Sequence, residues 1–428
     1  MQETVLPVGW KWSRLGDLVD NPKQDLVDGP FGSNLKSEEY IERGIPVFKI
    51  QNIKVNRFVD KKLSFISETK AKSLIRHSFK SGDLIITKLG EPLGLCCKVP
   101  KAYPFGIIVA DLMRLRPSKT KVNDDYLINV INSDIVKKQF KAITKGTTRA
   151  RVNLTIVREI KIPLPPKTIQ SAIVSKIEEL FSELDKGIEN LRLAQQQLKT
   201  YRQSVLKWAF EGRLTNENVK DGEMPEGWTW TNLGDICEIN RGKSKHRPRN
   251  EPSLYGGSYP FIQTGDIRNA KGGIISTFSQ TYSEKGLNQS KLWPKGTLCI
   301  TIAANIGETA ILGFDACFPD SVVGLVGKKN MLLNTYCNYY FIFFKKKLSE
   351  LAPATAQKNI NIEILERVSI PSCSIVEQKN IVDEIDSRFT VIDKIEESVN
   401  QDLQYSEVLR QSILKKAFEG KLSGSEYN

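Results

Sequence analysis

The segment RQSVLKWAFEGRL (202–214) recurs as RQSILKKAFEGKL (410–422), with ten of thirteen positions identical. A second pair repeats in the same order, because LPVGWKWSRLGD (6–17) matches MPEGWTWTNLGD (224–235) at seven of twelve positions. The offsets are 208 and 218 residues, so the chain holds two copies of one unit, the second shortened by ten residues in its middle. A repeat this long is a domain with an appendage rather than a solenoid repeat, and like units tend to pack around a pseudo-twofold axis.

Each copy divides into a body and a helical tail. Short β-branched runs such as IPVFKI (45–50) and GTLCITIAA (296–304), separated by Gly and Pro, predict strands and turns. The stretches at 124–143 and 334–350 predict helices. We therefore expect an α+β fold with two similar mixed α/β bodies. The expected divisions are a first body at 1–166, a long helix at 167–212, a linker at 213–223, a second body at 224–374 and a second long helix at 375–422.

The first tail carries a heptad repeat. Residues 168–211 contain no proline and one glycine. A hydrophobic seam sustained in this way predicts a coiled coil, and a helix of this length extends roughly 60 Å. The expected a positions are Ile177, Leu184, Leu191, Leu198 and Val205, and the expected d positions are Ile173, Leu180, Gly187, Ala194, Tyr201 and Trp208.

The second tail has a looser apolar stripe. Ser374 and Glu377 form a predicted capping box, and the tails end at Gly212 and Gly420, as C′ glycines do. Each tail either packs on its own body or pairs with the other tail. We favour pairing, which a twofold relation makes antiparallel. The stripe comprises Ile381, Ile385, Phe389, Ile392, Ile395, Val399, Leu403, Leu409 and Ile413.

Composition narrows the class of partner. The net charge of +13 favours a polyanion such as nucleic acid, although ribosomal, membrane-surface and ordinary soluble proteins share such charges. No apolar run is long enough to cross a bilayer, so we expect no membrane partner. Seven cysteines occur without a CxxC pair, which indicates reduced thiols in a cytoplasmic protein, with neither a disulfide framework nor a zinc site.

Motifs for catalysis are weak. His77 and His246 are isolated in the sequence, and a lone histidine is most often structural or solvated. CEINRGKS (237–244) resembles the end of a phosphate-binding loop, but Cys237 stands where that motif needs its first glycine. The chain is therefore predicted to bind rather than catalyse, with no metal and no cofactor of its own.

Two predicted loops carry cations that suit DNA. RGKSKHRPR (241–249) concentrates positive charge that can neutralise phosphates and reach base edges. DGPFGSNLKSEE (28–39) is glycine-rich and is a candidate to enter a groove. For both, the alternative is a solvated loop. The candidate DNA-contacting residues here are Lys36, Arg241, Lys243, Lys245, Arg247 and Arg249.

A second pair of loops occupies equivalent places in the two copies. GTTRARVN (146–153) and ATAQKNIN (354–361) each precede the last predicted strand of a body. Arginine suits guanine, whereas Gln and Asn suit adenine, so different side chains at one place favour different base choices. Loop capping and packing is the alternative. The candidates are Arg149, Arg151, Gln357, Lys358 and Asn359, whereas Trp10, Trp12, Trp228 and Trp230 are expected to anchor the body cores.

The repeated tail ends are candidates for docking a partner. Leu206, Leu414, Phe210 and Phe418 are expected to face inward. Twin surfaces suit two copies of one partner. The candidate partner-docking residues are Lys207, Glu211, Lys415 and Glu419.

The ordered motifs resemble a known family. GW and LGD open each copy, IPLPPKTIQ (162–170) and IPSCSIVEQ (370–378) close each body, and AFEG(R/K)L ends each tail. Each motif is weak alone, but their repeated order is similar to that of the specificity subunit of type I restriction–modification systems, over nearly the whole chain.

That resemblance implies two target-recognition domains separated by an antiparallel helical pair. Each domain would read one half of a bipartite, asymmetric site in double-stranded DNA, across an unread spacer. The subunit would not be catalytic. It would recruit two methylation subunits, which use S-adenosylmethionine to methylate adenine, and, in a restricting complex, two motor–nuclease subunits that use ATP and Mg²⁺. The family has no constant base-contacting residue to carry over.

Three rival functions remain at the level of sequence. One is a stand-alone two-headed DNA-binding protein, although no helix-turn-helix spacing supports it. Another is a coiled-coil scaffold that binds no DNA, against which the charge argues weakly. The third is an enzyme whose site lacks a recognisable motif. Copurification with a methyltransferase-sized partner separates these.

Overall fold

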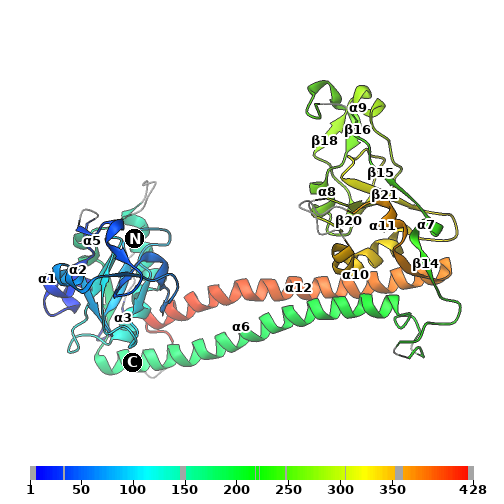
Figure 1. Ribbon diagram of the computed structural model, residues 1–428. Coiled ribbons are helices and arrows are strands. Elements are labelled where there is room, and N and C mark those ends of the chain that lie inside the picture. The colour runs from blue at the N-terminus through cyan, green and yellow to red at the C-terminus, as the bar shows by residue number, and fades with distance from the viewer. Residues whose placement is uncertain are drawn as a thin grey trace. The chain divides into compact units, whose positions relative to one another are not determined.

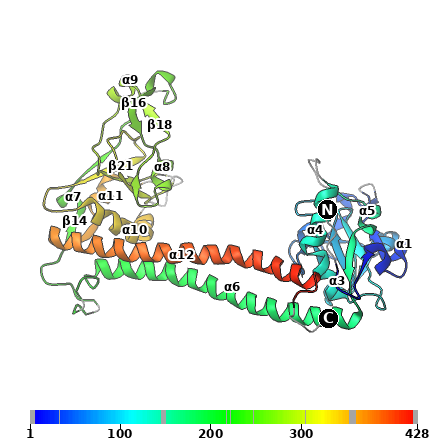
Figure 2. The same ribbon diagram turned by 180° about the vertical axis from the view of Figure 1, so that it is seen from behind.

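The computed structural model describes residues 6–31, 34–144, 151–216, 218–220, 222–245, 248–303, 305–351 and 360–422 (Figures 1 and 2). The chain forms two compact units. One comprises residues 1–191 with 401–428, and the other comprises residues 192–400. Each unit contains one body and portions of both long helices, α6 (Lys167–Phe210) and α12 (Ile375–Phe418).

The first body is built on two sheets and two two-stranded ribbons. The sheet orders are β10-β9-β12-β2 and β3-β7-β4-β11-β8, and in the ribbons β1 pairs with β13 and β5 pairs with β6. The strands are β1 (Lys11–Arg14), β2 (Leu26–Asp28), β3 (Tyr40–Ile41), β4 (Ile45–Phe48), β5 (Ile53–Lys54), β6 (Arg57–Phe58), β7 (Ser64–Ile66), β8 (Ser78–Lys80), β9 (Leu84–Thr87), β10 (Cys96–Lys98), β11 (Phe105–Ile108), β12 (Leu112–Leu115) and β13 (Lys161–Leu164). The helices are α1 (Pro22–Asp25), α2 (Glu68–Ser73), α3 (Asp124–Ile131), α4 (Asp134–Ile143) and α5 (Leu154–Arg158), with the 3₁₀ turns η1 (Leu15–Leu18), η3 (Ser37–Glu39), η4 (Ile50–Asn52) and η5 (Ile75–His77).

The second body repeats the central sheet with a different surround. Its main sheet has the order β15-β21-β19-β20-β17, and β14 pairs with β22 as β16 pairs with β18. The strands are β14 (Thr229–Asn232), β15 (Cys237–Arg241), β16 (Tyr255–Phe261), β17 (Ile274–Ile275), β18 (Gln280–Tyr282), β19 (Leu298–Thr301), β20 (Thr309–Leu312), β21 (Val322–Gly327) and β22 (Ser369–Ser372). The helices are α7 (Leu233–Ile236), α8 (Thr264–Asn269), α9 (Glu284–Asn288), α10 (Asn334–Leu351) and α11 (Ile362–Glu366), with the 3₁₀ turn η6 (Pro252–Leu254).

The strand registers make the two bodies equivalent position by position in the central sheet and in the ribbon beside it. In β1 and β13, Trp12 lies opposite Pro163, and in β14 and β22, Trp230 lies opposite Pro371. The central strands agree as well, because β2 pairs antiparallel with β12 as β15 pairs with β21. The internal repeat therefore extends to the backbone of both bodies.

The tryptophan prediction holds in part. Trp10 is buried in the first core, and Trp228 packs partly against the second. Trp230, however, is 59% exposed. It lies on the two-stranded ribbon β14 and β22, where three of the four β14 residues are exposed. The prediction that all four tryptophans anchor cores is wrong for Trp230.

The predicted helix at 124–143 is two helices, α3 and α4. Asn132 and Ser133 separate them. The buried Asn132 side chain accepts from the Cys96 amide at 2.9 Å and donates to the Cys96 carbonyl at 2.8 Å, which ties the break to strand β10. A side chain that serves the backbone of a strand in this way favours a turn over a continuous helix.

The long helices run antiparallel within each unit. In the second unit Gln195 donates to Asn400 at 2.7 Å, and seven residues further along α6, Arg202 pairs with Asp393, seven residues back along α12. In the first unit Arg410 pairs with Asp185. Both ribbon views show these helix segments side by side (Figures 1 and 2). The prediction that the tails pair with each other is confirmed.

The seam follows the predicted a positions more closely than the d positions. Ile177 and Val205 are buried, and Leu184, Leu191 and Leu198 are partly buried. At the d positions, Gly187 and Tyr201 are exposed, and the next residues, Ile188 and Arg202, turn inward. A straight α-helix drifts by about 20° per heptad relative to a 3.5-residue repeat, which explains the shift. On α12, Ile395 and Leu409 of the expected stripe are exposed.

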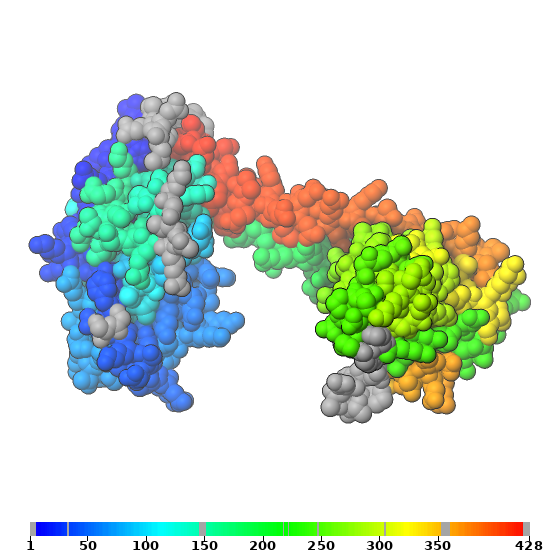
Figure 3. Space-filling model, turned by 90° about the horizontal axis from the view of Figure 1, so that it is seen from above, coloured from blue at the N-terminus to red at the C-terminus, as the bar shows by residue number. Residues whose placement is uncertain are grey.

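The end of each long helix packs into a body core. Phe418 of α12 joins the first core and meets Tyr126 edge-on at 5.4 Å, and Figure 3 shows the red end of α12 against the first body. Phe210 of α6 joins the second core and meets Tyr336 at 5.3 Å. These phenylalanines were expected to face inward and do so.

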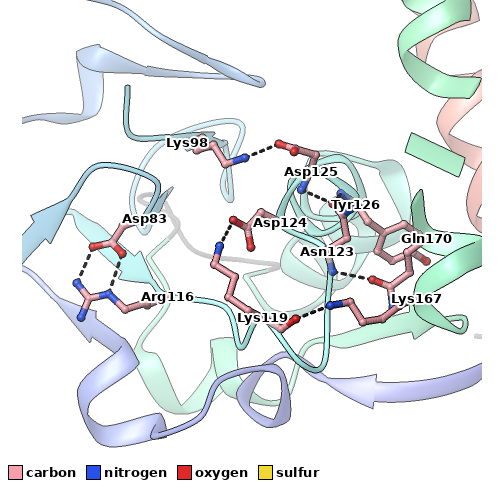
Figure 4. A network of polar contacts seen from close by, with 10 residues as sticks. All are labelled: Asp83, Lys98, Arg116, Lys119, Asn123, Asp124, Asp125, Tyr126, Lys167 and Gln170. Atoms are coloured by element: carbon pink, nitrogen blue, oxygen red, sulfur yellow. Dashed lines mark hydrogen bonds and ion pairs between the residues drawn. The ribbon is translucent and has the colours of Figure 1, made fainter. Parts of the chain in front are cut away.

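A buried glutamine holds the start of each long helix. Gln170 accepts from the Asn123 amide at 2.7 Å and donates to the Pro165 carbonyl at 2.9 Å (Figure 4). Gln378 accepts from the Leu333 amide at 2.8 Å and donates to the carbonyl of Cys373 at 3.0 Å. Buried backbone groups need such partners, so the repeated Gln of the sequence motif is a structural residue.

Candidate nucleic-acid interface

Three loops of the first body meet at one end of the strands of the sheet β10-β9-β12-β2. The first follows β2 from Gly29, the second follows β9 from Lys88, and the third is described from Arg151 onward. The Val152 amide donates to the Lys88 carbonyl at 3.1 Å, and the Lys88 amide donates to the Asp111 carbonyl at 2.8 Å. Leu89 also forms a β-bridge with Arg151. Backbone hydrogen bonds thus fix the second and third loops to each other.

Charged side chains join these loops. The Lys88 ammonium lies 3.1 Å from Asp28 and is nearly buried, while Arg151 pairs with Asp111. His77 approaches the Asp28 carbonyl through Nδ1 at 2.6 Å. Of these residues, sequence analysis selected Arg151 as a candidate and missed Lys88, since an isolated lysine at the end of a strand carries no sequence signal.

The second body builds the same arrangement with other side chains. The loops here follow β15 from Gly242 and β19 from Ile302, and a third ends at Ile360. The Ile360 amide donates to the Ile302 carbonyl at 3.0 Å, as Val152 donates to Lys88. The strand equivalence places Ile302 at the position of Lys88, so an apolar residue replaces a cation at the centre of the cluster.

Glycine begins the first loop in both bodies. The Gly29 amide donates to Leu112 at 3.1 Å, and the Gly242 amide donates to Val322 at 2.9 Å. A Cβ atom at Gly29 would lie 2.0 Å from the Val109 carbonyl oxygen, and one at Gly242 would lie 2.4 Å from the Phe318 carbonyl oxygen. Only a residue without a side chain allows the loop to leave the strand so close to the neighbouring backbone.

Three candidate cations of 241–249, which are Lys243, Lys245 and Arg249, follow β15 in the second body. Arg241 is the last residue of β15, not a loop residue, and within the described part of the chain its buried Nε has no hydrogen-bond partner. Lys243 and Lys245 are exposed. Arg249 is held by Asp320, to whose two carboxylate oxygens its Nη2 donates at 3.1 and 2.8 Å.

The remaining DNA candidates divide into placed and unplaced residues. Lys36 precedes η3 with an exposed side chain, and its amide donates to the Glu39 carboxylate at 2.7 Å. Arg149, Arg247, Gln357, Lys358 and Asn359, together with His246, lie outside the described residues.

The docking candidates form matched pairs at the two helix ends. Lys207 lies 3.7 Å from Glu211, and Lys415 lies 3.9 Å from Glu419. The lysine side chains are 53% and 62% exposed. Each glutamate also meets a cation beyond the helix, Arg213 or Lys421. The lysines are therefore the more accessible members of both pairs.

Comparison with known proteins identifies the family. The model of the type I restriction modification DNA specificity domain matches twice, at residues 7–192 and 225–405. The chain belongs to this family. The two matches coincide with the internal repeat, so each copy of the repeat is one specificity domain.

Relatives of the specificity family span the whole chain. The StySPI specificity subunit of a type I restriction enzyme from Salmonella potsdam is 24% identical, over 99% of this chain and 91% of its own length. The HsdS subunit from Thermoanaerobacter tengcongensis has a similar fold, with a TM-score of 0.64 and 23% identity over 98% of this chain and 99% of that chain. A chain from a structure that describes complex assembly and conformational transition of the type I R-M system gives a TM-score of 0.75 and 23% identity over 98% of this chain and all of that one.

The described residues give little support to a membrane-spanning helix, a metal site or a reactive cysteine. No helix within the described ranges has the length and apolar character to cross a bilayer. The described residues also bring together no group of three or more His, Cys, Asp and Glu side chains that would hold a metal ion. The cysteines are free, and burial raises the pKa of Cys97 to about 12, which keeps that thiol protonated at neutral pH.

Proposed function

We propose that this specificity protein directs a type I restriction–modification complex to a bipartite DNA site, with each body reading one half-site through its three-loop cluster. The observation that carries the proposal is that the two bodies share a backbone arrangement but differ in the side chains on it. Equivalent backbone hydrogen bonds assemble the loops in both bodies, while Lys88 in one cluster corresponds to Ile302 in the other. Different side chains on one frame suit the reading of two different short sequences.

The proposed recognition domains are residues 1–166 and 224–374. Exchanging 224–374 for the second body of another specificity subunit should change one half of the methylated motif and leave the other half intact. Sequencing of methylated adenines in the host genome measures this. A swap that alters both halves, or neither, would contradict the two-domain assignment.

The candidate loop residues divide by the contact that each suits. The cations Lys36, Arg149, Arg151, Lys243, Lys245, Arg247 and Arg249 suit phosphates or guanine, and Gln357 and Asn359 suit adenine. Replacing Gln357 or Asn359 with Ala should relax base choice in one half-site at a cost of about 1–3 kcal/mol for a lost bidentate contact. Unchanged base preference in both variants would assign this loop to structure.

The twin helix ends are the proposed docking sites for two methylation subunits, which supply adenine methylation with S-adenosylmethionine. The support is geometric, because the same exposed lysine recurs beside the same buried phenylalanine at Lys207 and Lys415. Charge reversal at Lys415 alone should stall assembly at one methylation subunit, as native mass measurement would show. If a variant with both lysines reversed in charge still forms the full complex, the methylation subunits dock at another surface. Motor–nuclease subunits with ATP and Mg²⁺ would complete a restricting complex in the cytoplasm.

The paired helices are the proposed spacer between half-sites. Inserting four residues after the exposed Gln196 lengthens α6 by roughly 6 Å, and DNA rises about 3.4 Å per base pair. The unread spacer should grow by about one or two base pairs while both half-sites stay the same. A seven-residue insertion controls for the change in heptad register. An active variant that methylates the original spacing would contradict the spacer role.

A further inference from the structure

A basic pocket of about 740 Å³ lies beside the loop cluster of the first body. Residues from α1, η5, β8, β12 and α5 line it, so segments distant in the sequence build one cavity. Its charged lining consists of Lys23, Arg76, Lys80, Arg114, Arg116 and Arg158, with no carboxylate among the lining residues.

One residue that lines the pocket is a buried arginine, and few groups around it offset its positive charge. Arg114 is 3% exposed and donates to the Ser78 carbonyl at 2.6 Å and to the Gln24 carbonyl, while its Nε has no hydrogen-bond partner among the described residues. Burial, and next the neighbouring Arg116, lower the pKa of the Arg114 guanidinium to about 10. An anion in the pocket would offset both effects.

Arg116 is the member of this set that has an acidic partner among the described residues. Asp83 accepts from its Nε at 2.8 Å and from its Nη2 at 2.7 Å (Figure 4). Within the described ranges, the other five cations have no carboxylate at ion-pair distance. Lys23, Arg76 and Lys80 are exposed at the rim, where a ligand can reach them.

The described residues of the second body do not form an equivalent pocket at the corresponding place in the sheet. The strand register places Gly324 at the position of Arg114 and Val326 at that of Arg116. The Trp293 ring, stacked on Phe318 at 4.9 Å, packs so closely over Gly324 that a Cβ there would lie 2.7 Å from it. An aromatic core thus stands where the first body has a basic cavity.

The pocket adjoins the proposed DNA-reading loops. Val27 lines the pocket, and it is followed by Asp28, which ends β2, and by Gly29, which begins the first loop. Arg76 also lines the pocket, and the next residue, His77, contacts the Asp28 carbonyl. A major groove is about 12 Å wide and is bordered by phosphates on both sides. A loop that enters the groove therefore brings the residues beside it within reach of a backbone phosphate.

We propose that this pocket binds a phosphate group of the DNA backbone at the edge of the first half-site, a contact that the second body lacks. The inference rests on the proposed function, since it assumes that the first body reads DNA. The contact adds affinity without sequence information, so the two bodies would divide the binding energy unequally. Phosphate on a free small molecule has the same chemistry and is the alternative source.

The test compares two double variants of the full chain, assembled with its methylation subunits. Arg76→Gln with Lys80→Gln removes two rim cations, and Lys61→Gln with Lys101→Gln removes two exposed cations outside the pocket. The slope of log affinity against log salt should fall by about one in the rim variant and stay unchanged in the control, with the methylated motif intact. Raising salt from 50 to 200 mM then costs the rim variant about fourfold less affinity than wild type.

Each other outcome has a separate meaning. A rim variant with the wild-type slope, in a complex that still binds its site, would overturn the backbone contact while leaving the proposed function intact. A wild-type complex that binds no duplex specifically would overturn both. Calorimetry of the DNA-free chain with inorganic pyrophosphate identifies the other source: binding that the rim variant loses, together with an unchanged DNA slope, assigns the pocket to a free phosphate compound and overturns the proposal.

Discussion

The helix ends and the loop clusters of the two units differ in how far the repeat has been kept. At the helices, Arg410 lies over the Phe181 ring at 4.4 Å and pairs with Asp185, while Arg202 lies over Phe389 at 4.5 Å and pairs with Asp393. Near the loops, in contrast, Lys88 corresponds to Ile302, and Arg114 corresponds to Gly324. Contacts that hold the long helices are alike because both units need the same packing, whereas the side chains near the loops differ, as the proposed reading of two different half-sites requires.

The largest expected effect is the loss of stability when a phenylalanine that packs the end of a long helix into a body core is removed. Phe210→Ala and Phe418→Ala each remove a ring packed in a body core and should lower the free energy of unfolding by about 3–5 kcal/mol. Chemical denaturation of each variant measures this. Lys207→Ala and Lys415→Ala, one turn away and exposed, are the controls and should change stability by less than about 0.5 kcal/mol. Strongly unequal losses for the two phenylalanines would show that the two frames are not equivalent.

The glutamines at the helix starts come next. Gln170→Ala and Gln378→Ala leave buried backbone groups without partners, which should cost about 1–3 kcal/mol each. Gln378 also donates to the Met331 carbonyl at 2.9 Å, so its loss should be the greater of the two. The exposed Gln197, changed to Ala, serves as the control in the same denaturation experiment. A larger loss for Gln170 would contradict this ranking.

The arginine contacts between the helices should contribute less. Arg202→Met and Arg410→Met retain the length of the side chain but remove the ion pair and the cation–π contact, at about 1 kcal/mol each, because the acidic partners are more than half exposed. Double-mutant cycles with Asp393→Asn and Asp185→Asn isolate the ion-pair part, which should weaken with added salt. Coupling energies that differ between the two units would show that the two ion pairs, although alike in geometry, contribute unequally to stability.

At the loops, the ion pair between Arg249 and Asp320 tests whether a charged side chain contacts DNA or only holds the structure. Asp320→Asn removes the partner of Arg249 and should strengthen DNA binding, while Arg249→Gln should weaken it and lower the salt slope by about one. Both changes leave an exposed, neutral side chain, so folding is preserved. If neither affinity nor slope moves in either variant, this ion pair belongs to the frame and not to the interface.

The last expected effect is a difference between the bodies at alkaline pH. Burial raises the pKa of Cys97 in the first body and of Cys237 in the second to about 12, against about 8.5 in an unfolded chain. Their contribution to stability is complete below pH 8.5 and is lost as the pH rises toward 12. The second body carries Cys237, Cys299, Cys317, Cys337 and Cys373, against Cys96 and Cys97 in the first, so it should lose more. Pulsed thiol labelling between pH 8 and 9.5, read by mass spectrometry, should find the second body opening first, and the reverse order would contradict the assignment.

The sequence alone determined the frame. The repeat of RQSVLKWAFEGRL, the heptads and the paired IPLPPKTIQ and IPSCSIVEQ motifs predict two bodies, two long helices and inward-facing Phe210 and Phe418, because packing and backbone satisfaction leave periodic and repeated residue types. The tertiary structure alone decided which residues share a site. Lys88, Asp111 and Arg151 come from separate segments, and so do Lys23, Arg76 and Arg114 of the basic pocket. Such groupings arise from strand pairing across the sheet, a long-range event that leaves no spacing in the chain to detect, whereas a helix seam is local and periodic.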